Sequence, residues 1–111
     1  MSRAERVAQR IKFEVSEIIR KYVDDPRIGF VTITGVSVSQ DIKNAKILFS
    51  IMGDEENKKE TMKGLNSAKS FIKGKLGETL NMRLMPQISF VRDDSLEKAS
   101  HVWSVMSKLK K

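Results

Sequence analysis

The chain has 111 residues, a formal net charge of +7, 40% hydrophobic and 32% charged residues, and no cysteine. This length suits one compact domain, expected over residues 1–111, and the apolar fraction excludes a disordered chain. The lack of cysteine excludes disulfides, thiolate catalysis and the common zinc sites, and no apolar run approaches the ~20 residues that cross a bilayer. Met1 leads into polar residues rather than an apolar signal core, so a cytoplasmic protein without a membrane partner is expected.

The positive charge is concentrated in two segments of the chain. Residues 1–21 carry six bases against three acids, and residues 58–83 carry seven against two. Residues 22–57 are acidic by three charges, and residues 84–111 are basic by two. Clustered lysine and arginine suit a polyanion such as RNA, because each neutralised phosphate releases counterions. A solvated face that keeps the protein soluble explains the charge equally well at this level.

A first helix is expected from Ser2, as the capping residue, to about Val23, with Glu5 reaching back to complete a capping box. Its core face is expected to consist of apolar residues at helical spacing: Val7, Ala8, Ile11, Val15, Ile18, Ile19 and Tyr22. A second stripe is basic and contains Arg3, Arg6, Arg10 and Lys21. Phe13 lies at its flank, and two glutamates dilute its charge.

Asp24 to Gly29 predicts a turn, because proline disfavours helical geometry in the preceding residue. A hairpin follows, with strands over Phe30–Ser39 and Asn44–Met52. The apolar alternation changes phase at Gly35, which predicts a β-bulge there. In the second strand Ile47, Phe49 and Ile51 are expected to be buried and Lys46 to point to the other face.

A second helical region is expected after Asp54, its capping residue. Its apolar residues recur every three or four positions without interruption through Ala68, Lys69 and Ser70. Gly74 and Gly77 within it suggest close packing or approach to a ligand backbone. A third strand over Gln87–Arg92, with Ile88 and Phe90 inward, and a last helix from Asp94 or Ser95 complete an α+β fold with helices on one sheet face. That helix has an apolar stripe of Leu96, Ala99, Val102, Trp103, Met106 and Leu109.

No residue pattern predicts catalysis or a cofactor. His101 is the only histidine, so neither a histidine–cysteine triad nor a histidine zinc site can be built. Acid clusters at 24–25, 54–56 and 93–94 could hold magnesium for a nuclease, but each sits at a helix end or turn that explains it. Phe49, Phe71, Phe90 and Trp103 are expected in the core.

Several stretches in order and spacing resemble the bacterial ribosome-binding factor A family. They cover nearly the whole chain: Arg6-Val7-Ala8, Asp25-Pro26-Arg27-Ile28-Gly29, Ile33 to Ser39 with Asp41, Asn44-Ala45-Lys46, Leu80 to Pro86, and Phe90 to Ser95. The resemblance implies a KH-like domain of the second type, ordered α-β-β-α-kink-α-β with a C-terminal helix and without the GxxG loop of ordinary KH domains. The family's Ala-x-Gly bend matches Ala68-Lys69-Ser70, where serine replaces glycine, so two helices are expected to meet at an angle there.

The resemblance also implies a role. It is that of a non-catalytic, monomeric assembly factor that binds the free 30S small ribosomal subunit and assists late maturation of 16S rRNA, especially in the cold. A KH-like protein acting on a different RNA is the alternative, and a metal-dependent nuclease is the third reading. The residues expected to contact RNA are Arg3, Arg6, Arg10, Lys46, Lys69, Ser70, Lys73, Lys75 and Arg83.

Overall fold

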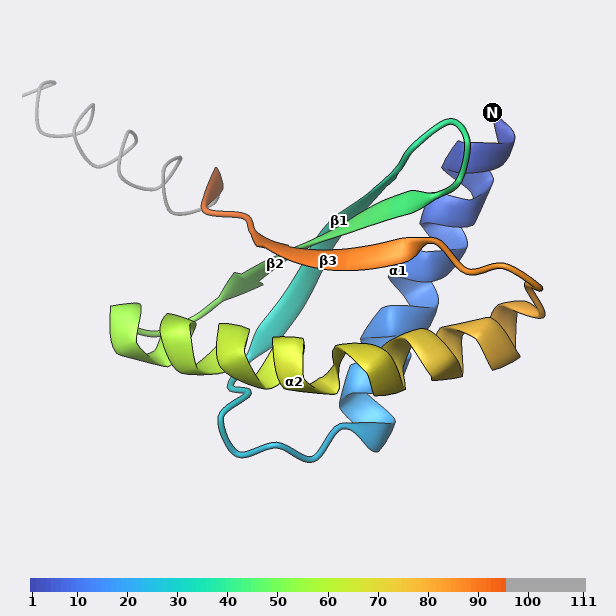
Figure 1. The fold of residues 1–111 in the computed structure, drawn as a ribbon. Helices are drawn as coiled ribbons and strands as arrows, with labels where there is room; N and C mark the ends of the chain where they lie inside the picture. Colours follow the sequence, from blue (N-terminus) through green and yellow to red (C-terminus); the bar gives the residue numbers. More distant parts are fainter. Residues whose placement is uncertain (96–111) are drawn as a thin grey trace, which may run out of the picture.

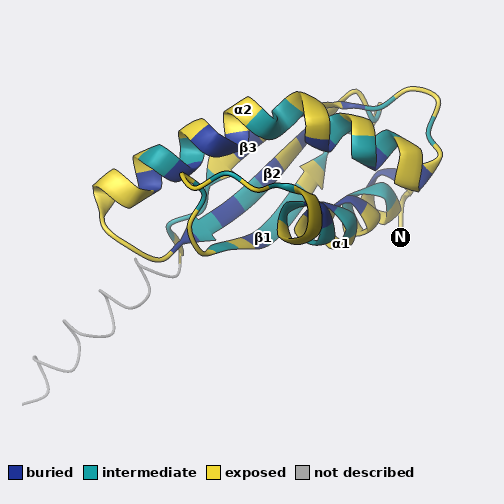
Figure 2. Ribbon diagram, turned by 90° about the horizontal axis from the view of Figure 1, so that it is seen from below, coloured by how far each residue is buried: buried dark blue, intermediate teal, exposed yellow. Residues whose placement is uncertain are grey.

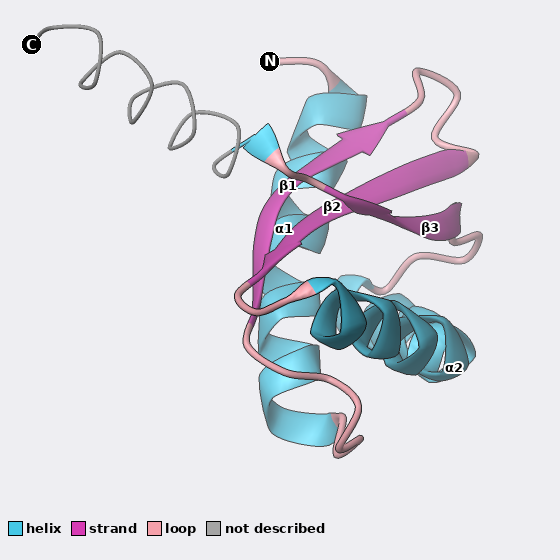
Figure 3. Ribbon diagram, turned by 90° about the vertical axis from the view of Figure 1, so that its left-hand side faces the viewer, coloured by secondary structure: helices cyan, strands magenta, loops and turns pink. Residues whose placement is uncertain are grey.

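The computed structural model describes residues 1–95. Its elements are α1 (Arg3–Tyr22), β1 (Val31–Val38), β2 (Asn44–Ile51), α2 (Glu55–Leu80) and β3 (Gln87–Arg92). The strands form one sheet in the order β1-β2-β3, in which β1 is antiparallel and β3 parallel to β2. Both helices pack against one face of this sheet (Figure 1, Figure 3). The predicted α+β class and KH-like order are therefore confirmed, whereas the expected last helix lies outside the described residues.

Local signals set where both helices begin. The Ser2 Oγ accepts a hydrogen bond from the Glu5 backbone N at 3.1 Å, and the Asp54 Oδ1 accepts one from the Asn57 N at 2.8 Å. Each bond satisfies one of the amides that a helix leaves free in its first turn. Both predicted capping residues are confirmed. No helix within residues 1–95 combines the length and apolarity needed to span a bilayer.

The core lies between the helices and the inner face of the sheet (Figure 2). Phe49, at the centre of β2, is fully buried and meets Phe90 of β3 edge-on, with ring centroids 6.3 Å apart. A ring pair of this geometry adds about 0.5–1.5 kcal/mol to the burial of its surface. The other fully buried core residues are Ile11, Val15, Ile47, Leu65, Ile72 and Leu76.

Two aromatic residues expected in the core lie at the surface instead. Tyr22 is 56% exposed and Phe71 is 46% exposed. Tyr22 is the last residue of α1, and this end of the helix extends beyond the sheet (Figure 3). The Lys75 Nζ lies 4.8 Å from the Tyr22 ring centroid and 6.0 Å from that of Phe71. The two rings therefore contact the Lys75 cation, whereas core side chains were expected to cover them.

The bulge predicted at Gly35 is confirmed. Ile33 pairs with Phe49 and Gly35 with Leu48, which leaves Thr34 as the extra residue of β1. An extra residue restores the phase of the apolar alternation, so Ile33 and the half-buried Val36 face the same layer. The Thr34 Oγ1 donates a hydrogen bond of 2.7 Å to the Asp93 Oδ2, which ties the segment after β3 to β1.

The expected pair of angled helices near Ala68 to Ser70 is wrong, because residues 55–80 form one α-helix. Its buried residues keep a helical spacing from end to end: Lys58, Thr61, Gly64, Leu65, Ile72, Leu76 and Leu80. A continuous buried stripe stabilises a continuous helix, and the exposed Ser70 has no need of glycine's conformational freedom. The G-x-x-G spacing of Gly74 to Gly77 lies inside α2, so it forms no loop.

Candidate nucleic-acid interface

The arginine stripe predicted on α1 is present and open to solvent. Arg3, Arg6 and Arg10 are exposed, and none of them forms an ion pair with another residue in the range 1–95. Arg6, Arg10 and Phe13 line a hollow of about 450 Å³ together with Gln9 and Glu14. Arg6, Arg10 and Phe13 share one side of α1, because residues three and four positions apart are neighbours on a helix surface. Phe13 is 65% exposed. Two guanidinium groups without an ion-pair partner in the described chain therefore share a hollow with an accessible aromatic ring and with Glu14.

The predicted residues on α2 divide into two kinds. Lys69 and Lys73 are half-buried and form no ion pair with another described residue, and Ser70 is exposed between them. Lys75 differs, because its Nζ lies 4.8 Å from the Tyr22 ring centroid, 6.0 Å from that of Phe71 and 3.8 Å from Glu78 Oε2. These contacts join α2 to the end of α1, and the contact of Lys75 with RNA stays a prediction.

The cationic groups do not gather into one patch. Lys75 meets Tyr22, so α2 crosses α1 at the C-terminal end of α1, whereas the arginine stripe begins at the other end. At 1.5 Å per residue, Arg6 lies about 24 Å from Tyr22 along the axis of α1. The sequence showed the two clusters but not this separation, because their distance depends on how the helices cross.

Arg83 and Lys46 lie elsewhere again. Arg83 is exposed in the segment between α2 and β3, at the end of the sheet that holds the β1–β2 loop, since the Gln87 N donates to the Lys43 O at 2.9 Å (Figure 1). Lys46 is exposed on β2 between the buried Ala45 and Ile47, so it projects from the face that neither α1 nor α2 covers. The helical layer thus contains the α1 stripe, Lys69 and Lys73. It does not contain Arg83 or Lys46.

Most acidic residues of the predicted clusters have local partners instead of a common site. A hydrogen bond from Arg27 holds the pKa of Asp25 below its ordinary value, and one from Arg92 does the same for the pKa of Glu55. Asp54 caps α2 and Asp93 accepts from Thr34. No group of three or more histidine, cysteine, aspartate or glutamate residues in the range 1–95 is placed to hold a metal ion. His101 lies outside that range.

The order of elements and the mixed sheet define a KH-like α+β protein whose exposed cations lie mainly on its helices. A family model described as ribosome-binding factor A matches residues 3–106. The chain therefore belongs to the ribosome-binding factor A family.

Individual relatives agree with this assignment. The chain is 46% identical to ribosome-binding factor A of Carboxydothermus hydrogenoformans over 107 residues, which are 96% of this chain and 86% of that protein. It is 43% identical to the Halothermothrix orenii protein of the same name, covering 97% and 88% of the two chains.

Two solved structures are also similar. A Thermotoga maritima protein determined by solution NMR aligns with a TM-score of 0.73 and 30% identity, over 82% of this chain and 87% of that one. A homology model of Thermus thermophilus ribosome-binding factor A, fitted into a cryo-EM map of a 30S complex, aligns with a TM-score of 0.69 and 24% identity, over 84% of this chain and 97% of that one. At this identity the second likeness concerns the fold alone.

Proposed function

We propose that the chain is a non-catalytic assembly factor of the cytoplasm that binds the free 30S subunit and assists late maturation of 16S rRNA, especially in the cold. Family membership supports the class of protein, and the Thermus thermophilus relative is described in a 30S complex. The observation that carries the proposal is the exposed surface of Arg6, Arg10 and Phe13 on α1, because none of its cations is neutralised within the described chain.

This surface suits RNA for two physical reasons. Guanidinium groups of Arg6 and Arg10 can each donate two parallel hydrogen bonds to a phosphate, which positions the protein without reading sequence. An exposed ring such as Phe13 can stack on an unpaired base, a contact worth about 1–3 kcal/mol. Lys69 and Lys73 supply a second set of phosphate contacts. Because the two sets are separated along α1, they would bind different stretches of the RNA backbone.

The test is co-sedimentation of purified variants with free 30S subunits over a series of salt concentrations. Arg6→Glu with Arg10→Glu, and Lys69→Glu with Lys73→Glu, are each expected to weaken binding. The slope of log affinity against log salt should fall by roughly one for each phosphate that the variant no longer neutralises. All four residues lie outside the core, so the fold should remain intact.

A control variant with the same change in charge distinguishes the loss of a direct RNA contact from the effect of a lower net charge. Lys59→Glu with Lys63→Glu alters two exposed lysines of α2 outside the predicted surface and should bind nearly as the parent does. If both predicted pairs co-sediment like the parent at every salt concentration, the surface is wrong, and Lys46 becomes the next candidate. Equal affinity for an unrelated RNA would favour the alternative KH-like role, and magnesium-dependent cleavage of RNA would contradict a non-catalytic function.

A further inference from the structure

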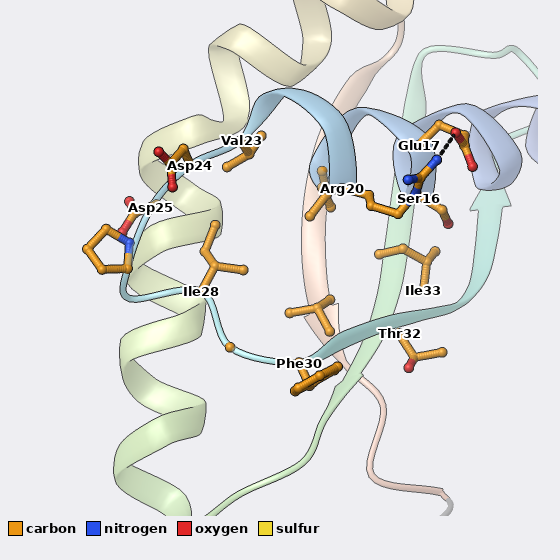
Figure 4. Close-up of a pocket in the computed structure, with 14 residues that line it drawn as sticks. Ser16, Glu17, Arg20, Val23, Asp24, Asp25, Ile28, Phe30, Thr32 and Ile33 are labelled. Atoms are coloured by element: carbon orange, nitrogen blue, oxygen red, sulfur yellow. Dashed lines mark hydrogen bonds and ion pairs between the residues drawn. The ribbon is translucent and has the colours of Figure 1, made fainter.

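A groove separates the C-terminal half of α1 from the segment that leads into β1 (Figure 4). Its volume is about 850 Å³, and it lies far from the arginine stripe at the start of α1. Apolar side chains line much of it: Ile19, Val23, Ile28, Val31 and Ile33. Phe30 adjoins these residues and is 86% exposed, which is unusual for an aromatic ring beside an apolar groove. The groove thus combines an apolar floor with an uncovered aromatic anchor.

The groove is built in advance rather than opened by a ligand. The Asp25 carboxylate accepts from the backbone N and the guanidinium of Arg27, and the Ile28 N donates to the Asp25 O at 2.9 Å. The Gly29 N donates to the Thr61 Oγ1 of α2 at 3.3 Å, so the loop is anchored to the neighbouring helix. A wall fixed in this way lowers the entropic cost of binding a partner.

The groove differs in charge from the predicted RNA surface. Its lining contains three acids, Glu17, Asp24 and Asp25, and one base, Arg20, although the whole chain carries +7. Glu17 pairs with Arg20 at 2.8 Å and with Lys21 at 3.2 Å, and Asp25 pairs with Arg27 at 2.7 Å. Asp24 differs, because it forms no ion pair with any other residue in the described part. The unpaired Asp24 carboxylate repels RNA phosphates and attracts lysine or arginine. At Asp24, charge complementarity therefore favours a basic group of a protein over nucleic acid.

The shape of the groove indicates an extended occupant. One wall is β1, and β1 is an edge strand, because within residues 1–95 only β2 pairs with it. The outward backbone groups of an edge strand can pair with another extended chain, whose alternate side chains then enter the neighbouring groove. The chain's own residues 96–111 are also basic and apolar, but their apolar spacing is helical rather than alternating. An extended segment of another protein fits these features better.

We infer that this groove binds a basic, extended peptide segment of a partner protein, which pairs with the edge of β1, inserts apolar side chains beside Phe30 and places a cation at Asp24. This surface goes beyond the proposed RNA contacts and lies along the C-terminal half of α1, whereas Arg3, Arg6 and Arg10 lie in the N-terminal half. An assembly factor with both surfaces would hold RNA through its arginines and a protein tail through this groove.

The first test requires no ribosome. A fluorescein-labelled ten-residue peptide of alternating lysine and valine serves as the probe, and its binding to the full chain is measured by fluorescence anisotropy. Asp24→Lys and Phe30→Ser should each raise the Kd at least about tenfold, as for residues at the centre of an interface. Glu56→Lys and Leu84→Ser are the matched controls, since both residues are exposed and lie outside the groove, and they should leave the Kd unchanged. An equal Kd for the parent, Asp24→Lys and Phe30→Ser, or no binding to the parent, overturns the inference.

The second test identifies the natural partner and rests on the proposed function. A photoreactive benzoylphenylalanine replaces Phe30, the complex with purified 30S subunits is irradiated, and the products are analysed by mass spectrometry. A cross-link to a lysine- or arginine-rich segment of a ribosomal protein supports the inference. A cross-link to rRNA or to residues 96–111 of the chain itself overturns it. Failure of the parent to co-sediment with subunits would instead contradict the proposed function, and the peptide measurement still decides the groove.

Discussion

Gly74 and Gly64 lie in the same helix but are predicted to respond in opposite directions when alanine replaces them. A Cβ at Gly74 would meet no atom within 4 Å, and this residue is exposed in the interior of α2. Alanine is favoured over glycine in a helix by about 1 kcal/mol, because glycine loses more backbone entropy on folding. Gly74→Ala should therefore raise the free energy of unfolding by roughly 1 kcal/mol and the Tm by about 4 to 8 °C.

Gly64→Ala gains the same helical preference but meets a steric obstacle. Its Cβ would lie 2.6 Å from the Ile28 Cγ1 and 3.3 Å from the Ile28 Cδ1. Forcing one extra carbon into a packed contact costs about 1–3 kcal/mol, which exceeds the helical gain over most of this range. The net expectation is a loss of up to about 2 kcal/mol. Gly64→Ala should therefore lower the Tm.

Thermal unfolding followed by circular dichroism, with urea unfolding at 25 °C as a second measure, tests both variants. Adding Ile28→Ala to Gly64→Ala makes room for the new methyl group. The double variant should then lose less stability than the sum of the two single losses. A Gly74→Ala protein that melts below the parent, or a Gly64→Ala protein that melts above it, would refute the packing argument. If Gly74→Ala is stable but binds 30S subunits poorly, Gly74 is a site of ligand approach.

Three further predictions concern stability. Thr34→Val removes the hydroxyl that donates to Asp93 and should cost about 0.5–1.5 kcal/mol in urea unfolding, whereas Thr34→Ser should recover most of that loss. The hydrogen bond from Ser39 lowers the pKa of Asp41 from its ordinary 3.8, so this carboxylate stabilises the fold above that pH and ceases to do so as the pH falls through the lowered pKa. The Tm deficit of Asp41→Asn at pH 7 should accordingly shrink towards zero on acidification below about pH 4, and a constant deficit would contradict the assignment. Ser70→Gly should destabilise the continuous α2 by roughly 0.5 kcal/mol in the same urea assay, and a gain in stability would indicate that a bend is preferred there.

The sequence alone determined the parts of the fold that depend on neighbours in the chain. Ser2 and Asp54 marked the helix starts because a capping side chain bonds amides only three residues away. The phase change at Gly35 revealed the bulge because side chains alternate strictly along a strand. Helical spacing through 68–70 indicated one helix, and it proved a better guide than the bend implied by the family resemblance.

The candidate sites were only partly visible in the sequence. The composition of the arginine stripe could be listed, but its separation from Lys69 and Lys73 depends on the crossing of two helices. Tyr22 follows the periodicity of a core residue and is nevertheless exposed, because α1 extends beyond the sheet that would cover it. The groove at Phe30 could not be predicted from the sequence, because its walls come from a helix, a loop and an edge strand. None of these three segments has an unusual sequence by itself. Periodicity fixes which side of an element faces inward, whereas burial and the grouping of charges depend on where its neighbours end, and only the tertiary structure decides that.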